Sequence, residues 1–214
     1  MTTLLFYLAV LLLFLLICTI LLLVYVSGVF HSVETCLSED IPFLKKGATF
    51  YYKINRGSYG SLGSFFTEAY SVAPKVTQCA VYYDDPAKVI ENDCRSAIGV
   101  LLNDEMLYKA PDLEKNGFKK FQFPPIKQAL YSKFPHTSFL SIFLGFNKFL
   151  PILRRKLMEL GCTHFTFIEV YDEDTIHYIG ITDDISEFTV TDFRTNKLDE
   201  NELIASVDGK EKSE

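Results

Sequence analysis

The sequence begins with a long apolar segment that carries no charge, residues 4–26. Its 23 residues would form a helix about 35 Å long, because an α-helix rises about 1.5 Å per residue. That length crosses a hydrocarbon core of about 30 Å with some tilt. Tyr7 and Tyr25 lie near its two ends, where amphipathic rings favour the headgroup region. A cleaved signal peptide is the alternative, but it would need a basic start and a shorter apolar core. We therefore expect residues 1–27 to be a transmembrane anchor.

The charges that flank this span predict the side of the membrane on which the rest of the chain lies. No Lys or Arg precedes the span, whereas Lys45, Lys46 and Lys53 follow it within about 30 residues. Positive side chains resist translocation, so the carboxyl side is expected to be cytosolic. The segment after the span also lacks an Asn-x-Ser/Thr sequon and a closely spaced cysteine framework, which agrees with a cytosolic location.

Composition excludes several classes of function. A net charge of −6 and a pI of about 5.3 argue against nucleic-acid binding, because no basic stripe is available to neutralise phosphates. The 19 Phe and 12 Tyr predict a core or a pocket rich in rings. We find no metal-ligand spacing among the histidines, no phosphate-binding loop and no nucleophile motif. The sequence thus predicts no metal, no cofactor and no enzymatic activity.

After the span, the chain is long enough for one domain and a short tail. Residues 28–47 mix small, polar and apolar residues and are expected to be a linker with one strand. Residues 48–190 are predicted to be the domain, and residues 191–214 a disordered acidic tail.

The first half of the domain has a β-α-β-β pattern. Residues 48–56 alternate with a period of two, which is typical of a strand. Apolar residues between Leu62 and Tyr70 then recur at helical spacing until Pro74 stops the helix. Residues 78–83 and 95–102 are predicted to be the next two strands.

The second half is expected to repeat that pattern. Pro135 and the β-favouring residues 137–143 suggest two strands within residues 127–149. Pro151 fits the first turn of a helix that Gly161 would cap. Residues 163–171 and 175–182 are then predicted to form a hairpin. The expected fold is α+β, in which the two halves form one antiparallel-rich sheet with both helices packed on one face.

One predicted strand places an acid among rings. The period of two puts Phe165, Phe167, Glu169 and Tyr171 on a single face. Because a carboxylate buried without a partner costs several kcal/mol, such a face suits a cationic ligand that rings can also hold. The alternative is a carboxylate at the rim of the sheet that reaches solvent or pairs with Arg95 or a lysine.

Three segments carry a family resemblance. Residues 57–68, residues 80–86 followed by 93–99, and residues 168–177 resemble the gyrase-inhibitor-like (GyrI-like) domain. Together with the anchor, they resemble the testis-expressed ER-phagy receptor family. This resemblance implies a single-pass protein of the endoplasmic reticulum membrane with a short lumenal amino terminus and a cytosolic domain. It also implies that the cleft between the two halves binds small lipophilic cations, with Glu169 as the acid and Tyr171 as a ring. Candidate cleft residues are Glu169, Tyr171, Phe165, Phe167, Tyr82 and Tyr83.

The tail departs from that family. Its receptors carry an acidic Phe-x-x-Leu type segment that docks on autophagy modifiers, whereas residues 191–214 contain only Phe193, followed three residues later by Asn196. The docking motif is missing from the tail. Lys210 and Lys212 stand at the third and fifth places from the carboxyl end and resemble a dilysine signal for retrieval to the endoplasmic reticulum. Because alternate residues of an extended chain share a face, one acidic groove could meet both ammonium groups.

The sequence thus favours an adaptor anchored in the endoplasmic reticulum membrane, whose cytosolic domain binds a partner or ligand. The expected partners are cytosolic proteins, among them the autophagy machinery or a vesicle coat. The alternatives are a membrane-tethered domain that binds or scavenges a lipophilic cation, and a hydrolase that uses Glu169 with Tyr171.

Overall fold

A computed structural model describes residues 2–194 of the chain. The predicted tail from residue 195 onward, with Lys210 and Lys212, lies outside the described residues. Helix α1 (Thr2–Val26) projects away from everything else, and none of its residues is buried. Its apolar core has a mean hydropathy of 3.2, so it is long and apolar enough to cross a membrane. This helix is compatible with the predicted anchor.

The rest of the chain is organised around one antiparallel sheet of eight strands in the order β1-β6-β8-β7-β3-β4-β2-β5. Its two central strands, β3 and β7, belong to different halves of the chain. The two β-α-β-β halves therefore form one continuous sheet, as predicted. The strands are β1 (Cys36–Ser38), β2 (Ala48–Arg56), β3 (Gln78–Tyr82), β4 (Arg95–Leu102), β5 (Lys119–Phe123), β6 (Ala129–Pro135), β7 (Phe167–Tyr171) and β8 (Thr175–Ile181).

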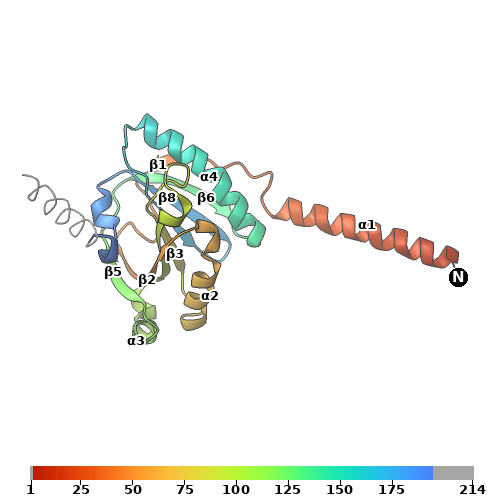
Figure 1. Ribbon diagram of the computed structural model, residues 1–214, viewed down its shortest axis with the longest axis horizontal. Coiled ribbons are helices and arrows are strands. Elements are labelled where there is room, and N and C mark those ends of the chain that lie inside the picture. The colour runs from red at the N-terminus through yellow and green to blue at the C-terminus, as the bar shows by residue number, and fades with distance from the viewer. Residues whose placement is uncertain (1, 195–214) are drawn as a thin grey trace, which may run out of the picture.

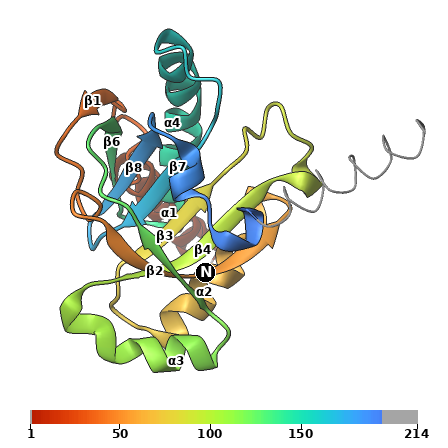
Figure 2. The same ribbon diagram turned by 90° about the vertical axis from the view of Figure 1, so that its left-hand side faces the viewer.

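Helices α2 (Gly63–Val72) and α4 (Phe139–Glu159) pack on one face of this sheet, which confirms the prediction (Figure 2). Leu153 and Leu157 of α4 join a core that includes Ile98 of the sheet. Ala69 of α2 packs with Val100 in a second core. The short helix α3 (Ala110–Lys115) lies between β4 and β5 in the chain.

The opposite face is closed by two segments from outside the predicted domain limits. Ile41 and Leu44 come from the predicted linker, and Phe193 comes from the predicted tail, yet all three are buried in the core of this face. The short 3-10 helix Ile185–Phe188 adds Phe188 to the same core. The packed unit therefore extends beyond residues 48–190 at both ends, because this face would otherwise expose its apolar side chains to water.

The start of α4 corrects the sequence prediction. The predicted strand over residues 137–143 and the predicted helix start at Pro151 are both wrong. Ser138 and Ser141 form a reciprocal capping box that begins the helix at Phe139. Pro151 lies inside the helix, although its ring removes one backbone donor there. Packing of the apolar face of α4 on the sheet outweighs both local preferences.

Candidate functional site

A cleft of about 620 Å³ lies between α2 and α4, above the central strands β3 and β7. Its lining is mostly aromatic and aliphatic, with a few polar groups. Both halves of the domain contribute to it, because α2 belongs to the first half and α4 to the second. The lining residues are Tyr59, Gly60, Leu62, Gly63, Phe66, Thr67, Gln78, Tyr82, His136, Phe139, Ile142, Phe143, Phe146, Asn147, Glu169 and Tyr171.

Glu169 is the charged group of this cleft. It lies in the middle of β7 opposite Ala80 of β3, and its side chain is buried, with 1% of the residue exposed. Its Oε2 atom accepts hydrogen bonds from the hydroxyls of Tyr82, at 2.6 Å, and of Tyr171, at 2.8 Å. Its other oxygen, Oε1, has no hydrogen-bond partner among residues 2–194. The carboxyl group is therefore only half satisfied by the protein.

Burial raises the pKa of Glu169 from 4.5 to about 7, because the ionised form loses its hydration. The hydroxyls of Tyr82, Tyr171 and Tyr178 act in the opposite direction and limit the rise. Tyr178 of β8 lies directly opposite Glu169, and its hydroxyl interacts with the carboxyl group but makes no hydrogen bond of ordinary geometry in the described part of the chain. Near neutral pH, the protonated and ionised forms of Glu169 are thus both populated.

Aromatic rings surround the carboxyl group. Tyr82 is stacked on Phe167 with ring centroids 4.5 Å apart, and Tyr59 meets Tyr82 edge to face at 4.8 Å. On the other side, Phe66 of α2 contacts the ring of Tyr171 at 5.2 Å. A cation is attracted by the faces of such rings and by the negative charge of a carboxylate among them. The cleft thus has the chemistry of a site for an apolar cation.

The candidate residues from the sequence do not all meet here. Glu169, Tyr171 and Tyr82 line the cleft, and Phe167 lies beneath Tyr82. Phe165 does not line the cleft: its ring packs against Phe167 and beside Arg154. It also precedes β7, which begins at Phe167 and not at residue 163 as predicted.

Tyr83 belongs to the opposite face of the sheet. Its hydroxyl donates to the carbonyl of Phe188 at 3.3 Å, and its ring packs in the core of that face. Adjacent residues at the end of a strand point to opposite sides, so Tyr82 and Tyr83 cannot share the cleft.

Several cleft residues were missed by sequence reasoning. Phe66 was assigned only to the apolar stripe of its helix, and Phe146 lies in the region whose structure was predicted incorrectly. Tyr59 comes from the short 3-10 helix Tyr59–Ser61 and His136 from a loop, and neither segment has a periodicity that marks a side chain as inward. His136 contacts the ring of Tyr171 at 5.6 Å. The missed residues share only an aromatic ring, and aromatic content alone is too general to assign a residue to a site.

The segment that follows β3 has a structural function. Asp84 accepts two hydrogen bonds from the Arg95 guanidinium, at 2.8 and 2.9 Å, and a third from the Arg95 backbone. Asp85 pairs with Arg154 of α4 at 2.7 Å, and this hydrogen-bonded pairing helps to lower the pKa of Asp85. The two aspartates thus fasten the chain to β4 and α4. Arg95 is held by Asp84 and does not pair with Glu169.

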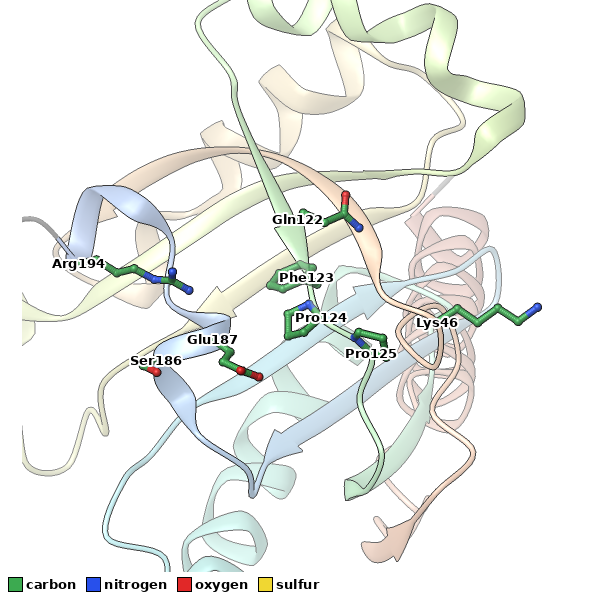
Figure 3. A pocket seen from close by; sticks show the side chains of 8 residues that line it. All are labelled: Lys46, Gln122, Phe123, Pro124, Pro125, Ser186, Glu187 and Arg194. Atoms are coloured by element: carbon green, nitrogen blue, oxygen red, sulfur yellow. The ribbon is translucent and has the colours of Figure 1, made fainter.

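A second hollow, of about 480 Å³, lies on the other side of the molecule (Figure 3). It is lined by Lys46, Gln122, Phe123, Pro124, Pro125, Ser186, Glu187 and Arg194. The side chain of Lys46 points away from the other labelled residues. Its charged groups are all exposed, so none of them needs a ligand to compensate for burial.

The described residues contain no group of three or more His, Cys, Asp or Glu side chains that could hold a metal ion. All five cysteines are free thiols.

Comparison with models of protein families finds no match. Among curated proteins, the chain is 32% identical over 198 residues to testis-expressed protein 264 of Homo sapiens, covering 91% of this chain and 62% of that protein. It is also 32% identical over 167 residues to the Mus musculus homolog, covering 76% of this chain and 54% of that protein. The chain thus spans less than two thirds of the length of these relatives.

Among solved structures, the C-terminal domain of EcmrR gives a TM-score of 0.39 at 11% identity, over 69% of this chain and 96% of that one. The sequence comparisons identify the chain as a relative of testis-expressed protein 264 over most of its length.

Proposed function

We propose that this chain is a membrane-anchored binding protein of the endoplasmic reticulum, whose cytosolic domain holds a small apolar cation in the cleft above Glu169. The single observation that carries this proposal is the buried carboxyl group in an aromatic cleft, whose Oε1 atom finds no hydrogen-bond partner within residues 2–194. The resemblance to GyrI-like domains supports it, because the cleft between their two halves binds lipophilic cations. The anchor is α1.

The energetics of Glu169 favour a cationic ligand. Burial by the protein disfavours ionisation of Glu169. A cation beside Oε1 would supply the missing partner and would offset that cost. The faces of Tyr59 and Phe66 would add cation–π attraction and would bury an apolar substituent.

A lipophilic cation such as tetraphenylphosphonium tests this proposal. The full chain in bilayer nanodiscs is titrated by equilibrium dialysis at pH 8 and at pH 5.5. Because only the ionised carboxylate attracts the cation, affinity should fall about 30-fold at the lower pH, in proportion to the ionised fraction of a group with a pKa of about 7.

Glu169→Gln should abolish the pH dependence and most of the binding. Glu105→Gln, which removes an exposed carboxylate, is the matched control and should bind like the wild type. Equal affinity of the wild type and Glu169→Gln at pH 8 would refute the proposal.

Binding and hydrolytic scavenging can be separated with a cationic ester as the probe. We propose binding without turnover, so the ester should be recovered intact after incubation with the chain. Hydrolysis that disappears in Glu169→Gln would instead support a membrane-tethered scavenger.

The location in the endoplasmic reticulum and the adaptor function extend the proposal. The resemblance to the ER-phagy receptor family supports them, with the autophagy machinery or a vesicle coat as cytosolic partners. A protease added to sealed microsomes should digest the domain and leave a small fragment that contains α1. Full protection of the domain would refute the cytosolic assignment.

The retrieval signal has its own test. Lys210→Ser with Lys212→Ser should let the protein reach the Golgi or the cell surface. Unchanged residence of the double variant in the endoplasmic reticulum would show that these lysines do not retain it.

A further inference from the structure

The turn that follows α1 is fixed to the domain. Ser27 is buried, and Gly28 has a φ of +84° that favours glycine. A Cβ atom at Gly28 would lie 2.9 Å from the ring of Phe134, so only glycine allows this close approach. The end of α1 therefore has a defined position against β6, which carries Phe134.

Thr137, just before α4, and Lys148, near the middle of α4, complete this attachment. The Lys148 ammonium donates to the carbonyls of Gly28, Val29 and His31 at 3.2, 2.5 and 2.8 Å. A cation at this place also compensates the partial negative charge at the carboxyl end of α1. The Thr137 hydroxyl donates to the carbonyl of Val26, the last residue of α1, at 2.8 Å. The beginning of α4 is thus held beside the point where α1 leaves the domain (Figure 1).

Large apolar side chains are exposed at this place. Phe139 is 84% exposed and Phe143 is 60% exposed, and their spacing of four residues puts them on one side of α4. Phe30, in the turn after α1, is 77% exposed. These rings lie within a few residues of the groups that bind the end of α1, and a soluble surface would rarely gather them.

The nearest apolar medium is the membrane itself. If α1 crosses a bilayer, its last residue, Val26, marks the boundary of the hydrocarbon core, and Thr137 is in contact with that residue. Phe139 follows two residues later, at the depth where aromatic side chains are favoured. The membrane that α1 crosses would therefore cover the exposed rings, and no protein partner is needed to explain them.

We propose that Phe30, Phe139 and Phe143 lie in the headgroup region of the membrane that α1 crosses, so that the mouth of the cleft opens onto the bilayer. The exposed rings of Phe139 and Phe143 line the cleft at its mouth, whereas the buried Glu169 lies at the bottom of the cleft. The docking requires only that α1 spans a membrane. The choice of ligand rests on the proposed function: an apolar cation would reach Glu169 from the lipid phase, as a cationic amphiphile already concentrated in the membrane.

The absence of tryptophan from the sequence gives a direct test. Phe139→Trp in the full chain creates a single tryptophan, and the protein is reconstituted into vesicles whose lipids carry bromine near the headgroup end of the acyl chains. Insertion is verified by flotation of the protein with the vesicles. The tryptophan should emit at short wavelength and lose most of its intensity to the brominated lipids.

Tyr108→Trp is the matched control, because Tyr108 is 68% exposed but lies just before α3, at the opposite edge of the sheet from α4. Its tryptophan should be insensitive to brominated lipids and should be quenched by acrylamide in the water. Phe143→Trp repeats the test at a second position in case Phe139→Trp disturbs the capping of α4.

In protein that floats with the vesicles, emission at long wavelength without quenching by brominated lipids would overturn the docking. Emission at short wavelength that depends on protein concentration and not on bromine would also overturn it, because a second copy or another protein would then cover the rings. Protein that fails to float would refute the anchor itself. None of these readouts uses a ligand, so failure of cation binding at Glu169 remains a separate result.

Discussion

The neighbouring residues Tyr82 and Tyr83 point to opposite faces of the sheet and have different surroundings there. On the closed face, the Tyr83 hydroxyl donates to the carbonyl of Phe188 and accepts from the N–H of Val190, both at 3.3 Å, so the protein satisfies it in both directions. On the open face, the Tyr82 hydroxyl donates to Glu169, whose second oxygen has no hydrogen-bond partner in the part of the chain that the structure describes. The closed face thus satisfies this polar group within the protein, whereas the open face carries the site that we propose for a ligand.

Truncation in the closed face should have the largest effect. Phe188→Ala should lower the free energy of unfolding by about 3–5 kcal/mol, because Phe188 is 2% exposed and its removal leaves a cavity. Tyr70→Ala on α2, where the ring is 55% exposed, should change it by less than about 0.5 kcal/mol. Urea unfolding of the full chain in nanodiscs measures both, and equal losses would contradict the assignment of stability to the closed face.

The open face should make stability depend on pH. Because burial raises the pKa of Glu169 from 4.5 to about 7, the contribution of Glu169 is fully present below pH 4.5 and is lost as pH rises through 7. At about 1.4 kcal/mol per pH unit, the loss amounts to about 3 kcal/mol.

Subtracting the profile of Glu169→Gln isolates this effect from His177, whose pKa is lowered by burial and whose contribution therefore changes with pH in the opposite direction. Glu105→Gln should keep the wild-type profile. A difference between the wild type and Glu169→Gln that does not change with pH would show that Glu169 is not held in a water-poor environment.

The adjacent tyrosines allow the sharpest comparison of the two faces. Tyr82→Phe and Tyr83→Phe should each cost about 1–2 kcal/mol, because each removes a buried hydrogen-bonding hydroxyl. Only Tyr82→Phe should raise the pKa of Glu169 further, since the Tyr82 hydroxyl stabilises the ionised carboxylate. Carbon NMR titration of the Glu169 carboxyl group measures this, and a similar rise in Tyr83→Phe would mean that the faces are coupled.

The smallest effect is expected at the cap of α4. Ser138→Ala should cost about 1 kcal/mol, because it removes the side-chain acceptor for the N–H of Ser141. Hydrogen exchange should accelerate in the first turn of α4 and stay unchanged around Phe188 on the closed face. Acceleration on both faces would indicate that the cap supports the whole domain.

Local patterns in the sequence were sufficient for much of this protein. The uncharged run at residues 4–26 predicted α1, because length and hydrophobicity alone decide whether a helix can cross a bilayer. The period of two placed Glu169 and Tyr171 on one face of β7, because side-chain direction in a strand is a local property. The repeat of β-α-β-β elements predicted a single sheet, because two similar halves can join edge to edge.

Only the tertiary structure decided the rest. The sequence could not choose between Tyr82 and Tyr83. Alternation along a strand predicts that neighbouring side chains point to opposite faces, but it does not predict which face carries the cleft. The start of α4 was predicted incorrectly because its β-favouring residues give way to the capping box and to packing on the sheet. Phe193 joined the core because the closed face had apolar area to cover. Contacts between residues far apart in the chain settle each of these outcomes, and no local pattern records such contacts.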